Sequence, residues 1–450
     1  MASAYLYRTQ VAGTSTQKFT FSTWVRRSGA MSDYEGMLNC YTADANRNGI
    51  YFGSDTKLNV YFRTSSSSQI YYETTRRFRD THGWYHIVVA VDTTQSTAGD
   101  RVKIYINGVL ETDFGSSTNP GQNTNFSCIG TNGLDLEVGR MQYGSTNTKY
   151  LNGSMTHVHF TDGYVYAASN FGETDATTGI WKPKVSPTGI TYGNNGFFLK
   201  FDNSANMGLD SSGNTNNFTV NGTIIQTKDT PSNVFASLNA IDAAGQTLSN
   251  INLTGYNASS RCATSTLGFS KGKYYWECKV VTQNAYTMIV GIMNDSNMGV
   301  LANLASNANG WGYVLQSNQD GGKSFHNNST SSVLQSVSQG DIIQIAVDSD
   351  AGKIWFGVNG TYVSSGNPAT GANAVFTNVS TDKTLIPAYT AYNGSGGNPS
   401  LSFNFGNGFF GTTVVTSAQN PDDGIGIFEY DPPAGYRALC TKSINAQEYS

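Results

Sequence analysis

Apolar and polar residues alternate along many short segments of the chain, and one such pattern appears twice. The first copy covers residues 84–92 (WYHIVVAVD) and, after a Thr/Ser/Gly loop, residues 101–108 (RVKIYING). The second covers residues 341–348 (DIIQIAVD) and residues 353–360 (KIWFGVNG). Alternation with period two on both sides of turn-forming residues predicts a β-hairpin in each copy. Two related hairpins so far apart favour two β-sandwich domains of related construction.

The same reading divides the whole chain into four segments. Residues 1–165 are predicted strands separated by Gly, Ser and Asn turns, and residues 251–410 form a second such series. Between them, residues 166–250 are rich in turn residues with short apolar islands, which predicts an irregular but packed connector. Residues 411–450 contain a Pro-Pro turn and are predicted to form a C-terminal arm. The predicted fold class is all-β.

Both series of strands resemble known families. The order FTFSTWVRRSG, WYHIVVAVD, RVKIYINGVL, LEVGR and YLNGSMTHVHF resembles the laminin-G-like, concanavalin A-like jelly roll. The later order KGKYYWECKVV, YTMIVGIMND, GWGYVLQS, GDIIQIAVDSDAGKIWFGVNG and SLSFNFG resembles the SPRY domain. These resemblances imply two jelly-roll-like antiparallel β-sandwiches, concanavalin A-like and then SPRY-like. In SPRY domains, loops at one end form the partner surface, which implies residues 294–310 and 358–374 here.

Together with the connector motifs FGETD…TGIWKPK, DSSGN and DTPSN, the two domains resemble structural proteins of marine tailed bacteriophages. This resemblance implies a virion protein, a tail fibre or receptor-binding component that recognises host surface glycan or protein. Long fibres carry an N-terminal anchor and helical repeats, whereas here the lectin-like strands begin close to Met1. A capsid decoration or head fibre protein with a cementing role is therefore an alternative. The implied partners are other virion proteins and further copies of the chain, as a trimer if it is a fibre.

Composition limits the remaining classes. Only 13% of the residues are charged and the net charge is −4, and Lys and Arg form no basic stripe, which argues against nucleic-acid binding. No apolar run approaches the ~20 residues of a membrane span. The five cysteines lack C-x-x-C spacing and no secretory signal opens the chain, so we expect folding in the reducing host cytoplasm before assembly into a virion.

Catalysis needs its own test, because the concanavalin A-like fold includes glucanases. Retaining glycosidases use two carboxylates, which on a strand usually give an E-x-D-x-x-E pattern, and the chain has none. Asp135 and Glu137 share one strand face and are the nearest case, while Glu277 stands alone. His157 and His159 also share a face, but no third metal ligand is near them in sequence. We therefore expect a binding protein, with a glycan depolymerase as the competing class.

Calcium is a candidate ligand, because jelly-roll lectins often hold it in loops near the sugar site and it takes six to eight oxygens. Asp202, Asp210 and Asn214 lie in oxygen-rich loops. The same residues could instead form Asx turns around Gly208 and Gly213. The sequence leaves both interpretations open.

A sugar-binding surface needs exposed aromatic rings with amides nearby. Aromatic residues in loops with Gly, Asn or Ser meet that description. The candidates are Tyr34, Tyr143, Trp311, Tyr313 and Tyr392, with Tyr41 beside them. Trp311 lies in GWGYVLQ, where a core position in a strand is an equal alternative.

Overall fold

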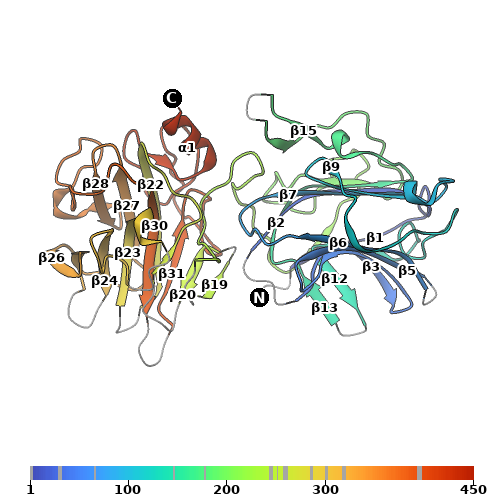
Figure 1. Cartoon of the computed structure of the whole chain (residues 1–450), viewed down its shortest axis with the longest axis horizontal. Helices are drawn as coiled ribbons and strands as arrows, with labels where there is room; N and C mark the ends of the chain where they lie inside the picture. Colours follow the sequence, from blue (N-terminus) through green and yellow to red (C-terminus); the bar gives the residue numbers. More distant parts are fainter. Residues whose placement is uncertain are drawn as a thin grey trace. The chain divides into compact units, whose positions relative to one another are not determined.

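The computed structural model describes residues 4–28, 33–64, 67–144, 147–176, 179–242, 247–250, 252–256, 262–283, 287–298, 303–316, 321–392 and 398–449. The chain divides into two compact units (Figure 1). Unit 1 consists of Met1–Gln226 and Thr230–Ser232, and unit 2 consists of Thr227–Asp229 and Asn233–Ser450. Both are built from antiparallel sheets, which confirms the predicted all-β class with two sandwiches.

Unit 1 contains two large sheets in its described residues, one of eight and one of six strands. The eight-stranded sheet has, in spatial order, β10 (Phe114–Thr118), β6 (Ser67–Arg77), β5 (Lys57–Thr64), β4 (Asn46–Phe52), β3 (Glu35–Ala43), β11 (Asp135–Val138), β1 (Tyr5–Thr9) and β18 (Thr219–Asn221). The six-stranded sheet has β17 (Phe197–Leu199), β14 (Gly153–Asp162), β2 (Lys18–Arg27), β7 (Tyr85–Asp92), β8 (Val102–Ile106) and β9 (Val109–Leu110).

The core of unit 1 contains the inward residues of both sheets. On β2, Phe19, Phe21 and Val25 are buried in it, together with Ile50 of β4 and Val60 of β5. These residues alternate with outward ones along each strand, as the period-two pattern requires. One face of each sheet therefore packs in the core, and the other is left for solvent or for a covering segment.

Unit 2 repeats this plan with two further sheets in its described part. The larger has β19 (Thr247–Ser249), β20 (Thr254–Tyr256), β31 (Ser400–Asn404), β22 (Lys273–Thr282), β27 (Ile342–Asp348), β28 (Lys353–Val358) and β29 (Thr361–Tyr362), with β34 (Arg437–Ala438) paired to β22. The smaller has β21 (Cys262–Thr264), β30 (Leu385–Tyr392), β23 (Thr287–Asn294), β24 (Gly310–Gln316), β25 (Lys323–His326) and β26 (Ser329–Val333).

Short elements complete both units. The small hairpins are β12 (Arg140–Tyr143) with β13 (Asn147–Tyr150), β15 (Gly172–Thr174) with β16 (Trp181–Pro183), and β32 (Phe409–Phe410) with β33 (Thr413–Val414). The helical elements are η1 (Ala98–Asp100), η2 (Ala168–Asn170), η3 (Asp295–Asn297), η4 (Val363–Ser365) and α1 (Thr441–Glu448). Within the described chain, every helix is too short or too polar to cross a membrane. All five cysteines are free and buried.

The two hairpins predicted from the repeated pattern are confirmed as β7–β8 and β27–β28. In both copies an Asn-Gly pair then turns the second strand of the hairpin into a further short strand, β8 into β9 and β28 into β29. Both residues of each pair have positive φ: 49° and 84° at Asn107 and Gly108, and 49° and 88° at Asn359 and Gly360. Positive φ at both central residues is the geometry of a type I′ turn, which matches the twist of the flanking strands.

In unit 1, the six-stranded sheet is covered on its outer face by residues 166–176 and 179–192. Phe171 and Trp181 pack there against Val88 of β7, and Trp181 Nε1 donates to His86 Nδ1 at 2.9 Å. His159 is fully buried, with its Nδ1 2.9 Å from the Tyr192 hydroxyl. The segment predicted as a connector thus contributes a cover and, through β17 and β18, two strands to the sheets of unit 1.

In unit 2, the segment predicted as an arm covers the outer face of the larger sheet. Phe428 and Tyr436 pack against Tyr275 of β22. The buried carboxylate of Glu277 accepts backbone N–H groups from Glu429 at 2.9 Å and Tyr430 at 2.8 Å. β34 then pairs in parallel with β22, and α1 follows. The covering residues are therefore integrated into the body of unit 2.

Candidate functional site

The outward face of the eight-stranded sheet in unit 1 carries polar and aromatic side chains, of which Asn39, Tyr51 and Asn59 are buried. Tyr61 pairs in register with Tyr71 on one side and with Gly49 on the other, and Gly49 pairs with Asn39. The intervening residues of the same strands point into the core. We call this surface the tyrosine face, and its residues are Asn39, Arg47, Gly49, Tyr51, Asn59, Tyr61, Arg63, Tyr71 and Glu73.

Two residues predicted from the sequence, Tyr34 and Tyr143, meet at the edge of the tyrosine face. Their ring centres are 5.4 Å apart, and Tyr34 also lies 5.6 Å from Tyr51. Both contacts are edge-on, with interplanar angles of 72° and 73°. The β12–β13 hairpin carries Tyr143 and passes so close to β3 that a Cβ on Gly36 would lie 2.2 Å from the carbonyl carbon of Arg140. Only glycine allows that approach.

The sequence analysis did not identify Tyr51, Tyr61 and Tyr71 as candidates, although a signal for them was present. Each follows a core residue by one position, as Tyr51 follows Ile50 and Tyr61 follows Val60. Tyrosine in the outward phase of three neighbouring strands indicates an aromatic surface, because a ring there is not needed for the core. Tyr61 and Tyr71 lie 5.9 Å apart at 80°, so the two rings present one face and one edge.

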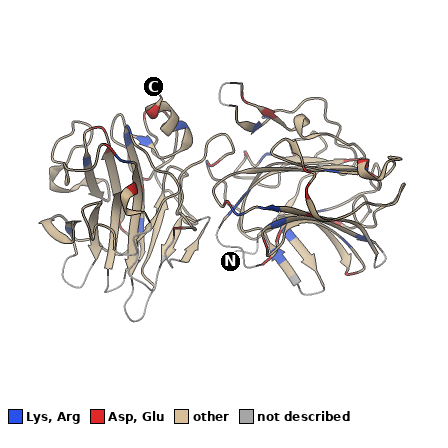
Figure 2. Cartoon of the chain, in the orientation of Figure 1, with Lys and Arg blue, Asp and Glu red and all other residues tan. Residues whose placement is uncertain are grey.

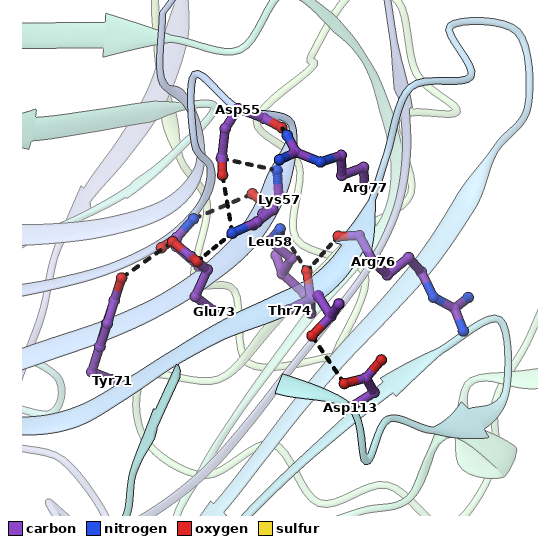
Figure 3. A network of polar contacts seen from close by, with 11 residues as sticks. Asp55, Lys57, Leu58, Tyr71, Glu73, Thr74, Arg76, Arg77 and Asp113 are labelled. Atoms are coloured by element: carbon purple, nitrogen blue, oxygen red, sulfur yellow. Dashed lines mark hydrogen bonds and ion pairs between the residues drawn. The ribbon is translucent and has the colours of Figure 1, made fainter. Parts of the chain in front are cut away.

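A network of polar contacts holds the end of the tyrosine face that β5 and β6 form (Figure 3). Lys57 Nζ lies 2.6 Å from Glu73 Oε1 and 3.3 Å from Asp55 Oδ2. The Tyr71 hydroxyl donates to Glu73 Oε2 at 3.3 Å. Burial first, and the charge of Glu73 second, raise the pKa of Tyr71. The network holds Tyr71 as a neutral hydrogen-bonding ring and neutralises Glu73.

At the other end of the face, Glu137 is held by two partners. Asn39 Nδ2 donates to its Oε2 at 2.8 Å, and Arg140 Nη2 lies 3.2 Å from its Oε1. Burial raises the pKa of Glu137, while Arg140 and Asn39 act against that rise. Asp135, two residues earlier on β11, is exposed and accepts from the Thr9 hydroxyl at 2.7 Å. Both carboxylates of the sequence-predicted pair therefore have structural partners.

Three other predicted binding residues lie in unit 2, away from the tyrosine face. Trp311 is 2% exposed and Tyr313 is fully buried, so both are core residues of β24, which for Trp311 is the alternative that the strand pattern also allowed. Tyr392 is half-buried at the end of β30, opposite Thr287. A side chain inside the core cannot stack on a sugar, which corrects the prediction for Trp311 and Tyr313.

The calcium candidates Asp202, Asp210 and Asn214 do not form a preformed set of oxygen ligands. Asp210 Oδ1 accepts from Phe198 N and Ser212 N, both at 2.8 Å, and its Oδ2 accepts from Ser212 Oγ and Asn216 N, also at 2.8 Å. The bond from Ser212 N is an Asx turn, which confirms that interpretation for Asp210. Asn214 donates its amide to two backbone carbonyls, and Asp202 is exposed. Across the described residues, no group of three His, Cys, Asp or Glu side chains is arranged for a metal.

The two loops implied as a SPRY partner surface pack partly against the body of unit 2. In the first, residues 299–302 lie outside the described residues, and Leu304 and Ala305 are fully buried. In the second, the Pro368 carbonyl accepts the Tyr436 hydroxyl at 3.5 Å. Partner binding by these loops stays a prediction.

The Lys, Arg, Asp and Glu positions coloured in Figure 2 are scattered over both units, and the described residues show no long run of either sign along the chain. This agrees with the low charged fraction of 13%.

Comparison with known proteins supports both halves of the sequence interpretation. Residues 2–169 match the family described as the concanavalin A-like lectin/glucanases superfamily, and residues 273–408 match the SPRY domain. No curated protein matches the chain.

Solved structures that resemble part of this chain include three with low sequence identity and low TM-scores. The SPRY domain of human HERC1 is 21% identical, with a TM-score of 0.30, covering 37% of this chain and 96% of that chain. The TRIM65 PSpry domain is 14% identical at a TM-score of 0.29, covering 38% and 91%. A heptameric SAP-like pentraxin from Limulus polyphemus is 16% identical at 0.27, covering 36% and 71%. At such scores these likenesses carry no argument about function. The two family matches give the domain composition: the chain carries a concanavalin A-like/laminin-G domain followed by a SPRY domain.

Proposed function

We propose that this protein is a non-enzymatic recognition protein whose first domain binds glycan through the tyrosine face. The observation that carries the proposal is the group of half-buried rings, Tyr34, Tyr143, Tyr61 and Tyr71, on the outward side of the eight-stranded sheet. Sugar sites combine such rings with a few polar groups that fix orientation. The hydroxyl groups of these tyrosines can supply such polar contacts, since Asn39 and Asn59 on the same face are buried and donate to Glu137 and to the Lys57 carbonyl.

The spacing of acids on the face supports binding over hydrolysis. Glu137 on β11 and Glu73 on β6 are four strand positions apart in the sheet order, which is about 19 Å at ~4.8 Å per strand. Glycosidase carboxylates lie ~5–9.5 Å apart. Asp135 and Glu137 are nearer, about 6.8 Å along one strand, and the raised pKa of Glu137 favours a depolymerase as the second candidate. Release of oligosaccharide from host polysaccharide, lost in Glu137→Gln, would establish that second function.

The direct test of the first function is glycan-array binding by the full chain. Tyr34→Ala and Tyr143→Ala should each weaken glycan retention about tenfold, since an aromatic contact contributes about 1–1.5 kcal/mol. Tyr164→Ala is the matched control, because Tyr164 is 38% exposed in the same unit but outside the face. Equal retention by all three variants would contradict the proposal.

For the setting in which this recognition acts, we propose a virion of a tailed bacteriophage. The connector motifs and the uncharged, Asn/Ser/Thr/Gly-rich composition support it. In that setting the tyrosine face would contact host glycan, and the SPRY domain would contact host protein or another virion protein. Labelled antibody on intact particles distinguishes a tail fibre from a capsid decoration by where it binds. Absence of label from every particle would contradict the proposal. Cross-linking on the particle would reveal a homo-oligomer, a trimer for a fibre.

A further inference from the structure

Two of the five buried cysteines lie side by side in the core of unit 1. Cys40 belongs to β3, and Cys128 belongs to the segment between β10 and β11. Their exposed fractions are 1% and 0%, and both side chains are part of the same hydrophobic cluster. A hydrogen bond joins the two thiol groups, and both cysteines are free. The fold therefore brings two reduced sulfur atoms together from distant parts of the sequence.

A single glutamine holds both cysteines in position. Gln10 Nε2 donates to Cys40 Sγ at 3.6 Å and to the carbonyl of Cys128 at 3.1 Å. Its Oε1 accepts from Gly130 N at 2.8 Å, which fixes the segment that carries Cys128. The Cys128 thiol donates to the carbonyl of Asn46 at 3.7 Å. Both sulfur atoms are thus oriented by side-chain and backbone groups around them.

The other three cysteines belong to unit 2 and are arranged differently. The Cys262 thiol lies 3.8 Å from the carbonyl of Ala263, and Cys440 Sγ lies 3.2 Å from the hydroxyl of Ser443. Cys278 is buried in the core on β22. These cysteines are internal references for the pair in unit 1, because they are equally buried but do not share its thiol–thiol hydrogen bond.

We infer that Cys40 and Cys128 are an oxidation site, at which hydrogen peroxide joins them in a disulfide bond that stabilises unit 1. The inference stands apart from the proposed function, because it needs no ligand on the tyrosine face. One thiolate attacks a peroxide oxygen, which breaks the O–O bond, releases hydroxide and leaves a sulfenic acid. The other thiolate attacks that sulfur, forms the S–S bond and releases a second hydroxide. The hydroxides take up the two thiol protons, so two thiols and one peroxide give one disulfide and two waters, and two electrons pass from sulfur to oxygen.

The bond would close a long loop, from β3 to the segment before β11. Such a closure lowers the entropy of the unfolded chain and so stabilises the fold. The hydrogen bond to Cys128 and burial raise the pKa of Cys40, the charge of Glu137 on β11 acts in the same direction, and Gln10 acts against them. Because the thiolate is the reacting form, cross-linking should be slow at neutral pH and should become faster as the pH rises.

The test incubates the full chain with and without hydrogen peroxide, blocks the remaining thiols in denaturant, and maps unreduced peptides by mass spectrometry. Peroxide should yield a cross-linked peptide with Cys40 and Cys128, about 2 Da lighter than its two reduced parts and separated by dithiothreitol. Thermal unfolding of unit 1 should shift upward by about 5 °C or more on oxidation and return on reduction. Cys40→Ser and Cys128→Ser should each lose the shift, whereas Cys262→Ser, the control in unit 2, should keep it.

Four results would overturn the inference. They are peroxide modification of Cys40 or Cys128 without a bond between them, a bond from either one to another cysteine, thiols that stay free until the chain is unfolded, and oxidation that leaves the unfolding temperature of unit 1 unchanged or lower. Peptide mapping uses the wild type alone, so it remains decisive even if a serine variant does not fold. Glycan binding by the reduced chain tests the proposed function separately.

Discussion

Both units cover the outer face of one sheet with an irregular segment, but the polar groups buried beneath the two covers differ. In each, a hairpin ending in Asn-Gly lies in a sheet whose outer face is covered by a later, irregular segment, and an aromatic residue of the cover sits on the turn. A Cβ on Gly108 would lie 2.9 Å from Trp181, and a Cβ on Gly360 would lie 3.0 Å from Tyr430. Beneath the cover, unit 1 buries neutral histidines and unit 2 buries the carboxyl group of Glu277.

This difference shows how a cover is attached when its sequence has no regular period. In unit 1 side chains of the cover bond to buried side chains of the sheet, since Trp181 Nε1 and the Tyr192 hydroxyl bond to His86 and His159, in addition to a backbone bond from Asp162 N to the Tyr192 carbonyl. In unit 2 the attachment is through the backbone, since Glu277 accepts the N–H groups of Glu429 and Tyr430. A cover held by side chains depends on particular residues, whereas a cover held by its backbone tolerates changes in most of its own side chains.

The largest expected effect separates these two modes directly. Trp181→Ala should destabilise unit 1 by about 3 kcal/mol, since it removes a large ring and leaves His86 Nδ1 without its donor. Tyr430→Ala should cost unit 2 only about 1–2 kcal/mol, because its backbone bonds to Glu277 persist. Denaturant unfolding followed by hydrogen exchange of β7 and β22 peptides measures each unit. An equal loss in both would remove the distinction, and Trp181→Phe, which keeps a ring, should recover about half of the loss.

The second expected effect is an opposite response to pH. Burial lowers the pKa of His86 to about 3 and of His157 to about 4. Below pH ~6.5 these histidines bind protons in the unfolded chain but not in folded unit 1. The free energy of unfolding of unit 1 therefore falls by about 2 kcal/mol per histidine at pH 5. Burial raises the pKa of Glu277 to about 7, so the folded unit 2 keeps a proton that the unfolded chain loses above pH ~4.5, and its stability falls as pH rises from 4.5 to 7.

Hydrogen exchange of β7 and β22 peptides between pH 4.5 and 7.5, corrected for intrinsic rates, measures both slopes. Glu277→Gln should flatten the slope of unit 2 and leave that of unit 1 unchanged. Slopes of the same sign in both units would contradict the contrast between histidine and carboxyl burial.

The smallest expected effect tests the shared part of the comparison. Gly108→Ala and Gly360→Ala should each destabilise their own unit by about 1–2 kcal/mol, because both positions have positive φ and both added methyl groups meet a ring. Thermal unfolding should show similar losses for the two variants. Gly213→Ala is the control for positive φ alone, since its Cβ would meet nothing within 4 Å, and its loss should be smaller.

Sequence reasoning found the hairpins because period-two alternation and turn-forming residues between the strands are local signals. It could not find the covers, because residues such as Trp181 and Phe428 lie in irregular segments and their partners are far away in the chain. At the candidate site it identified Tyr34 and Tyr143 as exposed loop residues but not Tyr51, whose strand it treated as a plain meander. It also proposed Trp311 and Tyr313, since a Gly-rich aromatic segment reads equally as a loop or as a tightly packed strand.

The parallel pairing of β34 with β22 has a consequence for how the second half of the chain matures. β22 pairs with β27 and β31, which both lie well downstream in the chain, and its last hydrogen bonds and the donors for Glu277 come from residues synthesised later still. A fragment that stops at residue 408, where the family match ends, would leave Tyr275 and Glu277 facing water. Such a truncated species would expose apolar surface and would be prone to aggregation. The nascent domain therefore stays aggregation-prone until residues 411–450 have been synthesised and cover the sheet.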